Sequence, residues 1–334
     1  MFPAVYGAVF AVGLPANVAG LAVVTQLLRR GNVLGVYLLN LCVSDLLYVA
    51  SLPVWVAYTH RGGDWPFSRA TCKAAAFISG ANMYATIAFL GCIAADRSVA
   101  TVFPLAARSV RSSRAAALVS LSIWLVVAAP HGVLLARPGL FFNDIEDNVT
   151  LCLDMFPLDN WRAHFNYYLV CAVFAIALLL LLASYCAIIR AVRLSIGLSP
   201  AQKRRLVSLL LGLIAIFVAC YLPYHVVCFI RSYRSDVGAC SCASESRLRP
   251  LHRVFSALTS LSAALDPFLN IFVSEDFKRD VRRVLVAIRP CCRRLAGARR
   301  RADKLRTATV TTVTKEQALD LRGLPSAGER SNSS

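Results

Sequence analysis

Long runs of apolar residues dominate this sequence and limit what the chain can fold into. Crossing the hydrocarbon of a bilayer takes roughly 20 apolar residues in a helix. Seven runs of this kind follow one another, at about 4–28, 34–58, 70–102, 115–136, 163–193, 203–233 and 252–273. The 334-residue chain is 57% hydrophobic and 16% charged, which is too little charge for a soluble domain of this length. The sequence therefore predicts an all-α integral membrane protein with a bundle of seven transmembrane helices.

The distribution of charge predicts the orientation of this bundle. Lys and Arg gather after the last apolar run, from Lys278 onward, and positive charge near helix ends favours the cytoplasmic side. An odd number of spans then places the amino terminus outside. The first apolar run begins almost at Met1, without a basic segment or a cleavage site, so we expect it to act as its own insertion signal. The net charge of +18 indicates contact with the anionic inner leaflet and not with nucleic acid.

Two domains are expected from the same pattern. Residues 1–290 form the bundle, which ends in a short amphipathic eighth helix over 275–288. Residues 291–334 form a basic, disordered cytoplasmic tail. Cys291 and Cys292 follow the amphipathic helix directly, and palmitoylation there would add a second membrane anchor.

The cysteines divide into several groups. The chain has twelve, and most lie inside apolar runs as packing residues. Cys72, at the start of the third run, and Cys152, between the fourth and fifth, fall on the expected outer side. An oxidising compartment at that side predicts a Cys72–Cys152 disulfide. Asn148-Val149-Thr150 is a glycosylation sequon in the same loop, which places Asn148 outside the cell.

Polar residues inside the apolar runs carry a family resemblance. They are Gly13 to Asn17 in the first run, Asn40 to Asp45 in the second, Asp96-Arg97 at the end of the third, Trp124 in the fourth, Cys220 to His225 in the sixth, and Ser260 to Pro267 in the seventh. In this order the set resembles the rhodopsin-like (class A) G-protein-coupled receptors over about residues 4–290. The strings Ser44–Tyr48, Leu52–Trp55, Phe156–Trp161 and Pro223–Val226 are most similar to the proton-sensing group, and within it to the T-cell death-associated, psychosine-receptor-like member. Ser195–Lys203 is instead similar to a member that responds to oxidised fatty acids.

The resemblance implies a polar cluster in the middle of the bundle. Asp45 and Asp266 are expected to face each other, with Asn82, Thr86 and Ser262 close by. In most receptors of the class such a cluster holds a sodium ion, and no other cofactor or metal site is expected. Two carboxylates in a low dielectric cannot both stay ionised cheaply, so a cation or a shared proton must compensate. The pair is therefore a candidate proton-coupled element, and the alternative is a hydrated polar plug that holds the helices together.

Histidine is the other candidate sensor, since its ordinary pKa of about 6.5 lies in the range of extracellular acidification. The chain has five histidines, all expected in the outer half or outer loops: His60, His131, His164, His225 and His252. Protonation near outer arginines would add repulsion that drives the outer helix ends apart. Only His225 matches a histidine of the proton-sensing motif, and ordinary loop or interface histidines are the alternative for the others.

The resemblance also implies a coupling surface for a heterotrimeric G-protein. Asp96 would hold Arg97 at rest, and Arg97 would meet the G-protein and Tyr185 when the sixth helix moves about Pro223. Lys203, Arg204 and Arg205 stand at the foot of that helix and would move with it.

Four residues depart from the family pattern. Ser98 follows Asp96-Arg97 where a Tyr is usual, and Asn270 stands at the position of the Tyr after Asp-Pro. Ala177 replaces the usual Pro of the fifth helix, and Val127 stands where the group has a pH-linked Glu. These changes favour weaker coupling or weaker proton sensitivity, and they keep a weakly coupled or decoy receptor open as an alternative.

The expected function is that of a plasma-membrane receptor activated by extracellular protons, modulated by a lysolipid, and signalling through cAMP or phosphoinositide pathways. Membrane lipids and arrestin are further candidate partners. The alternative within the class is a lysolipid or nucleotide receptor whose outer arginines hold a phosphate. A transporter or proton channel would need inverted repeats, and the sequence has no internal repeat. An enzyme is not expected, because there is no nucleophile–base pair, phosphate loop or metal-ligand spacing.

Overall fold

A computed structural model describes residues 2–105, 107, 111–136, 141–144, 149–153, 158–238 and 242–273. The side chains of 141–149, 242–246 and 269–273 are outside this description. Contacts divide the chain into two compact units, Met1–Val281 and Arg282–Ser334, and all described residues belong to the first. The expected eighth helix over 275–288, the tail 291–334, Asn148, Cys291 and Cys292 lie outside the described residues and stay predictions.

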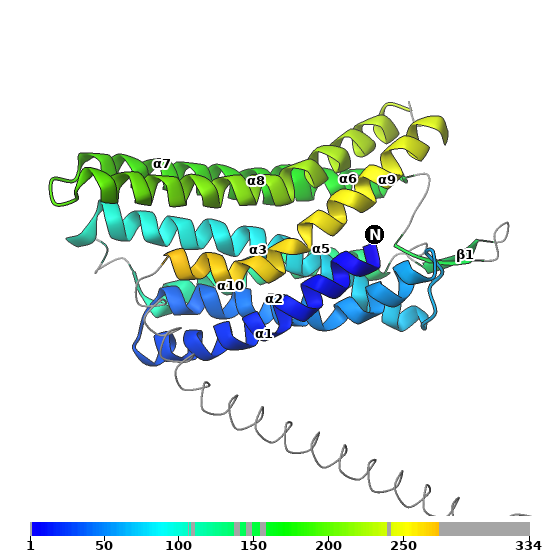
Figure 1. Cartoon of the computed structure of the whole chain (residues 1–334). Helices are drawn as coiled ribbons and strands as arrows, with labels where there is room; N and C mark the ends of the chain where they lie inside the picture. Colours follow the sequence, from blue (N-terminus) through cyan, green and yellow to red (C-terminus); the bar gives the residue numbers. More distant parts are fainter. Residues whose placement is uncertain are drawn as a thin grey trace, which may run out of the picture. The chain divides into compact units, whose positions relative to one another are not determined.

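Helices account for nearly all of the described residues (Figure 1). The hydrocarbon offers no water to backbone N–H and C=O groups, so a helix that bonds them internally is the economical way to cross it. Six helical segments are long and apolar enough to span a bilayer: α1 (Phe2–Arg29), α2 (Leu34–His60), α3 (Arg69–Val102), α5 (Ser113–Ala136), the continuous Asn160–Leu194 and α8 (Pro200–Asp236). The seventh crossing is divided at Ser260 into α9 (Cys242–Thr259) and α10 (Leu261–Val273). The predicted all-α bundle is confirmed.

Several of these segments differ in detail from the sequence prediction. Helix α9 begins at Cys242, ten residues before the expected 252. Asn160–Leu194 consists of α6 (Asn160–Tyr167), the π-helix η1 (Tyr168–Ala175) and α7 (Ile176–Leu194), and the π-helix was not predicted. Helix α8 begins three residues before the expected 203, because a capping box encloses its first turn. The Ser199 hydroxyl accepts from the Gln202 N–H, and the Gln202 amide oxygen accepts from the Ser199 N–H.

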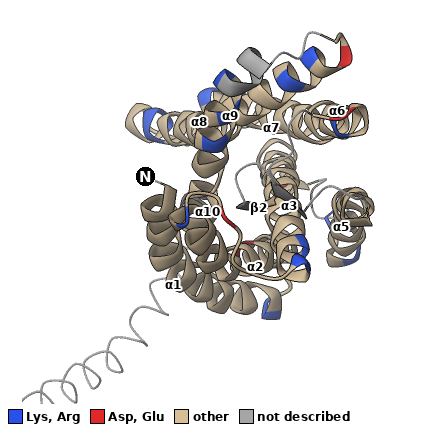
Figure 2. Cartoon of the chain, turned by 90° about the vertical axis from the view of Figure 1, so that its right-hand side faces the viewer, with Lys and Arg blue, Asp and Glu red and all other residues tan. Residues whose placement is uncertain are grey.

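Helix α3 lies in the middle of the bundle and packs against α2, α5 and α7, while α1 packs on α2 and α10. Figure 2 shows the helices end-on, with most of each helix tan and charged residues few. Polar side chains join helices where they are buried. The Asn17 Nδ2 donates to the Ala263 carbonyl at 2.7 Å, and the Trp124 Nε1 donates to the Asn40 Oδ1 at 2.9 Å. Residues that carried the family resemblance thus connect α1 to α10 and α5 to α2.

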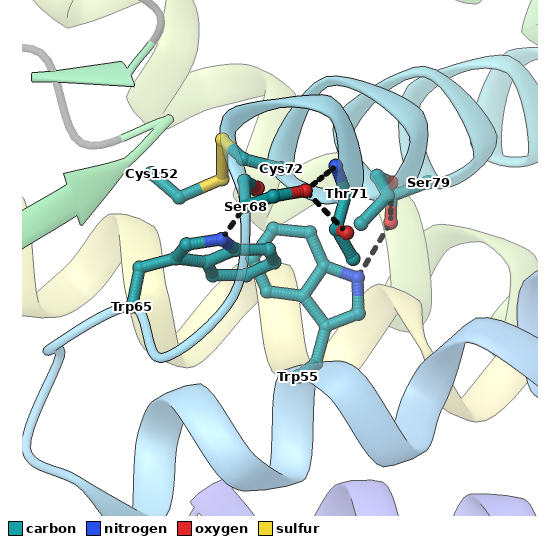
Figure 3. The surroundings of a disulfide bond; sticks show 8 residues. Trp55, Trp65, Ser68, Thr71, Cys72, Ser79 and Cys152 are labelled. Atoms are coloured by element: carbon teal, nitrogen blue, oxygen red, sulfur yellow. Dashed lines mark hydrogen bonds between the residues drawn. A yellow bond between two sulfur atoms is a disulfide. The ribbon is translucent and has the colours of Figure 1, made fainter.

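A short hairpin and a disulfide close one end of the bundle, here called the disulfide end. Strands β1 (Phe141–Asp144) and β2 (Val149–Cys152) pair antiparallel, and the sequence did not predict them. Cys152, at the end of β2, is bonded to Cys72 in α3, as predicted (Figure 3). The Trp65 ring packs beside this bond between Trp55 and Phe67. The backbone N–H of Trp65 donates to the Thr150 carbonyl at 2.8 Å. The hairpin is therefore held by a covalent bond and a backbone hydrogen bond together.

Changing Cys72 to Ser should release the hairpin from α3. Loss of a buried disulfide typically costs about 2–4 kcal/mol of folding free energy, so we expect the variant to be retained inside the cell. Surface labelling of intact cells measures the effect. Cys171→Ser is the control, because Cys171 is an exposed free cysteine in η1. Equal surface levels of both variants would contradict the prediction.

Candidate functional site

The two carboxylates expected in the middle of the bundle are both there, and both are fully buried. Asp45 in α2 and Asp266 in α10 are each 1% exposed and interact electrostatically. The Asp45 Oδ1 accepts from the Asn82 Nδ2 at 2.9 Å and from the Thr86 hydroxyl at 3.3 Å. The Asp45 Oδ2 and both Asp266 oxygens have no hydrogen-bond partner among the described residues. Such oxygens leave a charge uncompensated unless a proton or a cation joins them.

The space beside Asp266 is small. Asp266 and Ser262 line a cavity of about 30 Å³ with Tyr221, which is room for roughly one or two water-sized groups. Ser262 itself donates to the Thr259 carbonyl at 2.8 Å. The unpartnered carboxylate oxygens and the nearby hydroxyls are hard oxygen ligands. These residues fit a small hard cation, and they equally fit a shared proton.

His225 lies in an aromatic enclosure within α8. The side chain is 1% exposed, and its ring is stacked on Phe174 of η1 with centroids 3.8 Å apart. Tyr84 of α3 contacts the ring edge-on. Nδ1 lies 2.7 Å from the Tyr221 carbonyl, which can only accept, so Nδ1 carries the hydrogen. Nε2 is buried without a hydrogen-bond partner among the described residues.

His131 in α5 has a comparable setting. It is 4% exposed, its Nδ1 donates to the Val127 carbonyl at 2.7 Å, and its ring contacts Tyr84 and Phe165. Gly80 of α3 makes this approach possible, because a Cβ there would lie 2.6 Å from the imidazole. Any side chain at position 80 would displace the ring.

Two tyrosines connect three of the five histidines. Tyr84 contacts both His131 and His225, and Tyr224 contacts both His225 and His252. We call this series His131–Tyr84–His225–Tyr224–His252 the histidine–tyrosine chain; it links α5, α3, α8 and α9 near the disulfide end. The sequence reasoning missed Tyr84, Tyr224 and Phe174, and only their helical spacing from the histidines could have indicated them. His60 and His164 are exposed and are not part of the chain.

At the opposite end of the bundle, Asp96 has two cationic partners. The Arg97 Nη2 lies 2.9 Å from its Oδ2, as expected. Arg111, from the segment before α5, adds two hydrogen bonds of 2.6 and 2.8 Å, one to each carboxylate oxygen. Tyr185 is buried in α7, Lys203 donates to the Arg193 carbonyl, and Arg204 and Arg205 are exposed. The sequence reasoning placed Asp96 with Arg97 but missed Arg111, whose partner is 15 residues away.

Buried ionisable groups inside a bundle of apolar helices of membrane-spanning length indicate a polytopic membrane protein with a functional interior, since such groups are costly in a structural anchor. The family described as 7 transmembrane receptor (rhodopsin family) matches residues 16–269. This chain therefore belongs to the rhodopsin family of seven-transmembrane receptors. As a member it is a multi-pass plasma-membrane protein that couples to G-proteins and is not an enzyme.

Curated relatives agree with the resemblance in the sequence. G-protein coupled receptor 65 of Homo sapiens is 37% identical over 290 residues, which cover 85% of this chain and 86% of the relative. G-protein coupled receptor 68 of Mus musculus is 34% identical over 87% of this chain and 79% of its own length. The Uracil nucleotide/cysteinyl leukotriene receptor of Homo sapiens is 32% identical over 89% of this chain and 78% of its own length.

Arg111→Gln should lower the basal signalling of the receptor. Arg111 and Arg97 both bind the Asp96 carboxylate. Without Arg111, both carboxylate oxygens are available to Arg97, so Asp96 holds Arg97 more firmly. Hydrogen bonds to charged groups contribute about 1.5–3 kcal/mol each, which predicts at least a several-fold fall in G-protein activation measured in membranes. Arg114→Gln, at an exposed arginine in the first turn of α5, should have no effect. A rise in basal signalling would show that Arg111 restrains the inactive state instead.

Proposed function

We propose that this chain is a receptor activated by extracellular protons, with the disulfide end and the amino terminus outside the cell. The observation that carries the proposal is the setting of His225. An uncharged imidazole suits its aromatic enclosure, whereas an imidazolium would place a second N–H at Nε2, which has no acceptor among the described residues. A buried charge without a partner is costly, so protonation favours a conformation in which the ring leaves this enclosure.

Because of where His225 lies in the chain, movement of its ring would affect the whole of α8. His225 lies two residues after Pro223 in α8. The other end of this helix, capped by Ser199, lies at the Asp96 end of the bundle. A proline removes one backbone hydrogen bond and makes a helix easier to bend. Movement of the ring away from Phe174 and Tyr84 would change how α8 packs on η1 and α3. The same helix carries Lys203, Arg204 and Arg205 toward the proposed G-protein contact.

The carboxylate pair supports the proposal from a second direction. Asp45 and Asp266, with Asn82, Thr86 and Ser262, would hold a sodium ion in the resting state, which would balance their charge. A proton taken up by the pair would neutralise one of the charges that the sodium ion balances. The proton would therefore lower the affinity for sodium, because both cations compensate the same carboxylate oxygens. Acid would then shift the population toward the state that binds protons more tightly.

Ligand and pathway are part of the proposal. A lysolipid modulator, cAMP or phosphoinositide signalling and arrestin binding remain proposals, as does the decoy alternative raised by Ser98, Asn270, Ala177 and Val127. Titrating cAMP and inositol phosphate against external pH, with and without lysolipid, tests proton activation, the lysolipid, the two pathways and the decoy alternative. A flat response in both pathways, with normal surface expression, would overturn proton activation.

His225→Phe should move the pH of half-activation to a lower value or flatten the response. Phenylalanine retains a ring that can stack on Phe174 and removes the group that takes up the proton. The measurement is second-messenger level against external pH at matched surface expression. His164→Phe is the control, because His164 is exposed and outside the histidine–tyrosine chain. An unchanged midpoint in His225→Phe would shift the sensing role to the carboxylates.

Asp266→Asn should raise signalling at neutral pH and reduce what acid adds. The amide imitates a carboxyl that holds its proton permanently, so the pair no longer needs to take one up. The remaining response should be shallower, since fewer protons bind per receptor. Retention of the full wild-type pH curve would make the pair structural. Silence at every pH, with the protein at the surface, would assign Asp266 to the helix movement itself.

A further inference from the structure

One contact between α3 and α5 depends on a residue that has no side chain. The imidazole of His131 lies against Gly80, and a Cβ at position 80 would lie 2.6 Å from both Cδ2 and Nε2 of the ring. Real Cβ atoms do not approach other atoms this closely, and among the described glycines Gly80 alone would place a Cβ within 3.0 Å of another residue. Glycine weakens the interior of a helix relative to alanine. At position 80 it is therefore unfavourable for the helix and necessary for the ring.

Three further contacts hold the His131 ring in this position. Its Nδ1 donates to the Val127 carbonyl at 2.7 Å, and the ring packs against Tyr84 and Phe165. We call this position, enclosed by Gly80, Tyr84, Phe165 and the Val127 carbonyl, the Gly80 seat. Since Nδ1 carries the hydrogen, Nε2 is the nitrogen of His131 that can take up a proton.

The Gly80 seat is reached from the disulfide end of the bundle. Gly80 and His131 both line a cavity there, and the ring edge that carries Nε2 faces Gly80, where no side chain covers it. A neighbouring cavity shares four lining residues with this one: Tyr48, Ser79, Leu153 and Ser256. The Nε2 of His225, by contrast, is buried without a hydrogen-bond partner among the described residues. A proton in the cavity can therefore reach His131 before its ring moves, which is not so for His225.

The Gly80 seat suits an uncharged ring. The described groups around His131 are Gly80 and Tyr84 of α3, Phe165 and Arg162 of α6, and Tyr224 of α8 across the cavity. Arg162 interacts electrostatically with His131, and no carboxylate is among the described residues that line the cavity. An imidazolium in the seat would be repelled by this arginine without a described negative charge to offset the repulsion. Protonation thus favours a position of the ring outside the seat.

We propose that His131 is a second proton acceptor of the receptor and that Gly80 is the positioning residue that sets its response. The glycine lets the uncharged ring pack on α3, and this packing belongs to the resting state. Binding of a proton at Nε2 displaces the ring and loosens α5 from α3. The effect on signalling rests on the proposed proton activation, whereas the seat itself does not, so the test measures the two separately.

The test compares Gly80→Ala with Gly132→Ala, a control glycine beside His131 in α5 at which an added Cβ meets nothing within 4 Å. Both are made in the wild type and in His131→Asn. The asparagine amide can replace Nδ1 as the donor to Val127, does not titrate, and is short enough to leave room for a Cβ at position 80.

Two quantities are measured for each variant. The full chain in lipid nanodiscs, with ¹³C-labelled histidines, is titrated by NMR, and the signal lost in His131→Asn identifies His131. Second-messenger levels against external pH are recorded in cells at matched surface expression.

We expect Gly80→Ala to move both the His131 titration and the half-activation of signalling to higher pH. The resting position of the uncharged ring is lost, so less acid is needed to populate the displaced one. The expected shift is about half a pH unit, which is roughly a threefold change in proton affinity. Gly132→Ala should behave as the wild type. His131→Asn should make the response shallower, and Gly80→Ala should change nothing further in that background.

An unchanged His131 titration in Gly80→Ala, a shift to lower pH, or an equal effect of Gly80→Ala in the His131→Asn background would each overturn the positioning role. If Gly80→Ala fails to reach the cell surface, its rescue by His131→Asn supports the seat, and failure of that rescue contradicts it. A titration of His131 that depends on Gly80, in a receptor whose signalling ignores pH, would remove proton activation and leave the seat. A pH response in cells without any titration of His131 would do the reverse.

Discussion

The hydrocarbon around the bundle supplies no hydrogen-bond partners, and this constrains every polar group in the membrane-spanning part of the protein. Backbone groups meet the constraint by bonding inside helices, and buried side chains must find partners on neighbouring helices. The Asn17 Nδ2 and the Trp124 Nε1 each donate a hydrogen bond to another helix, which joins α1 to α10 and α5 to α2. Asp45 is satisfied at one oxygen and Asp266 at neither, among the described residues. These two carboxylates are therefore unsatisfied groups whose charge can change with the surroundings.

Those groups lie at different depths of one bundle, and α8 runs past them. Its outer part carries Tyr224 and His225 of the histidine–tyrosine chain, and Tyr221 lines the small cavity of Asp266. Its far end begins at the capping box of Ser199. Pro223 lies between Tyr224 and the far end of α8, so a movement on one side of the proline can change the tilt of the helix on the other side. Changes in charge at the disulfide end and in the centre can thus act on the same element.

The membrane spans, the disulfide and some of the polar contacts were predictable from the sequence, each for a different reason. The spans followed from apolar length, and the Cys72–Cys152 bond followed from placing both cysteines on one side of the membrane. The contacts of Asp96 with Arg97 and of Asp45 with Asn82 followed from the family resemblance. Arg111 and the aromatic partners of the histidines could not be found in this way. Their role depends on which helix faces meet, and apolar runs in a lipid environment carry little periodic signal for that.

The π-helix bears on one of the departures from the family pattern. Ala177 stands where a proline is usual, and a proline would interrupt the hydrogen-bond ladder of this helix. Tyr168–Ala175, directly before it, interrupts the regular ladder by other means, because a π-helix bonds to the fifth residue instead of the fourth. This turn places Phe174 against His225. The missing proline therefore does not leave the fifth span a uniform helix, and its irregular turn stands directly against the proposed sensor.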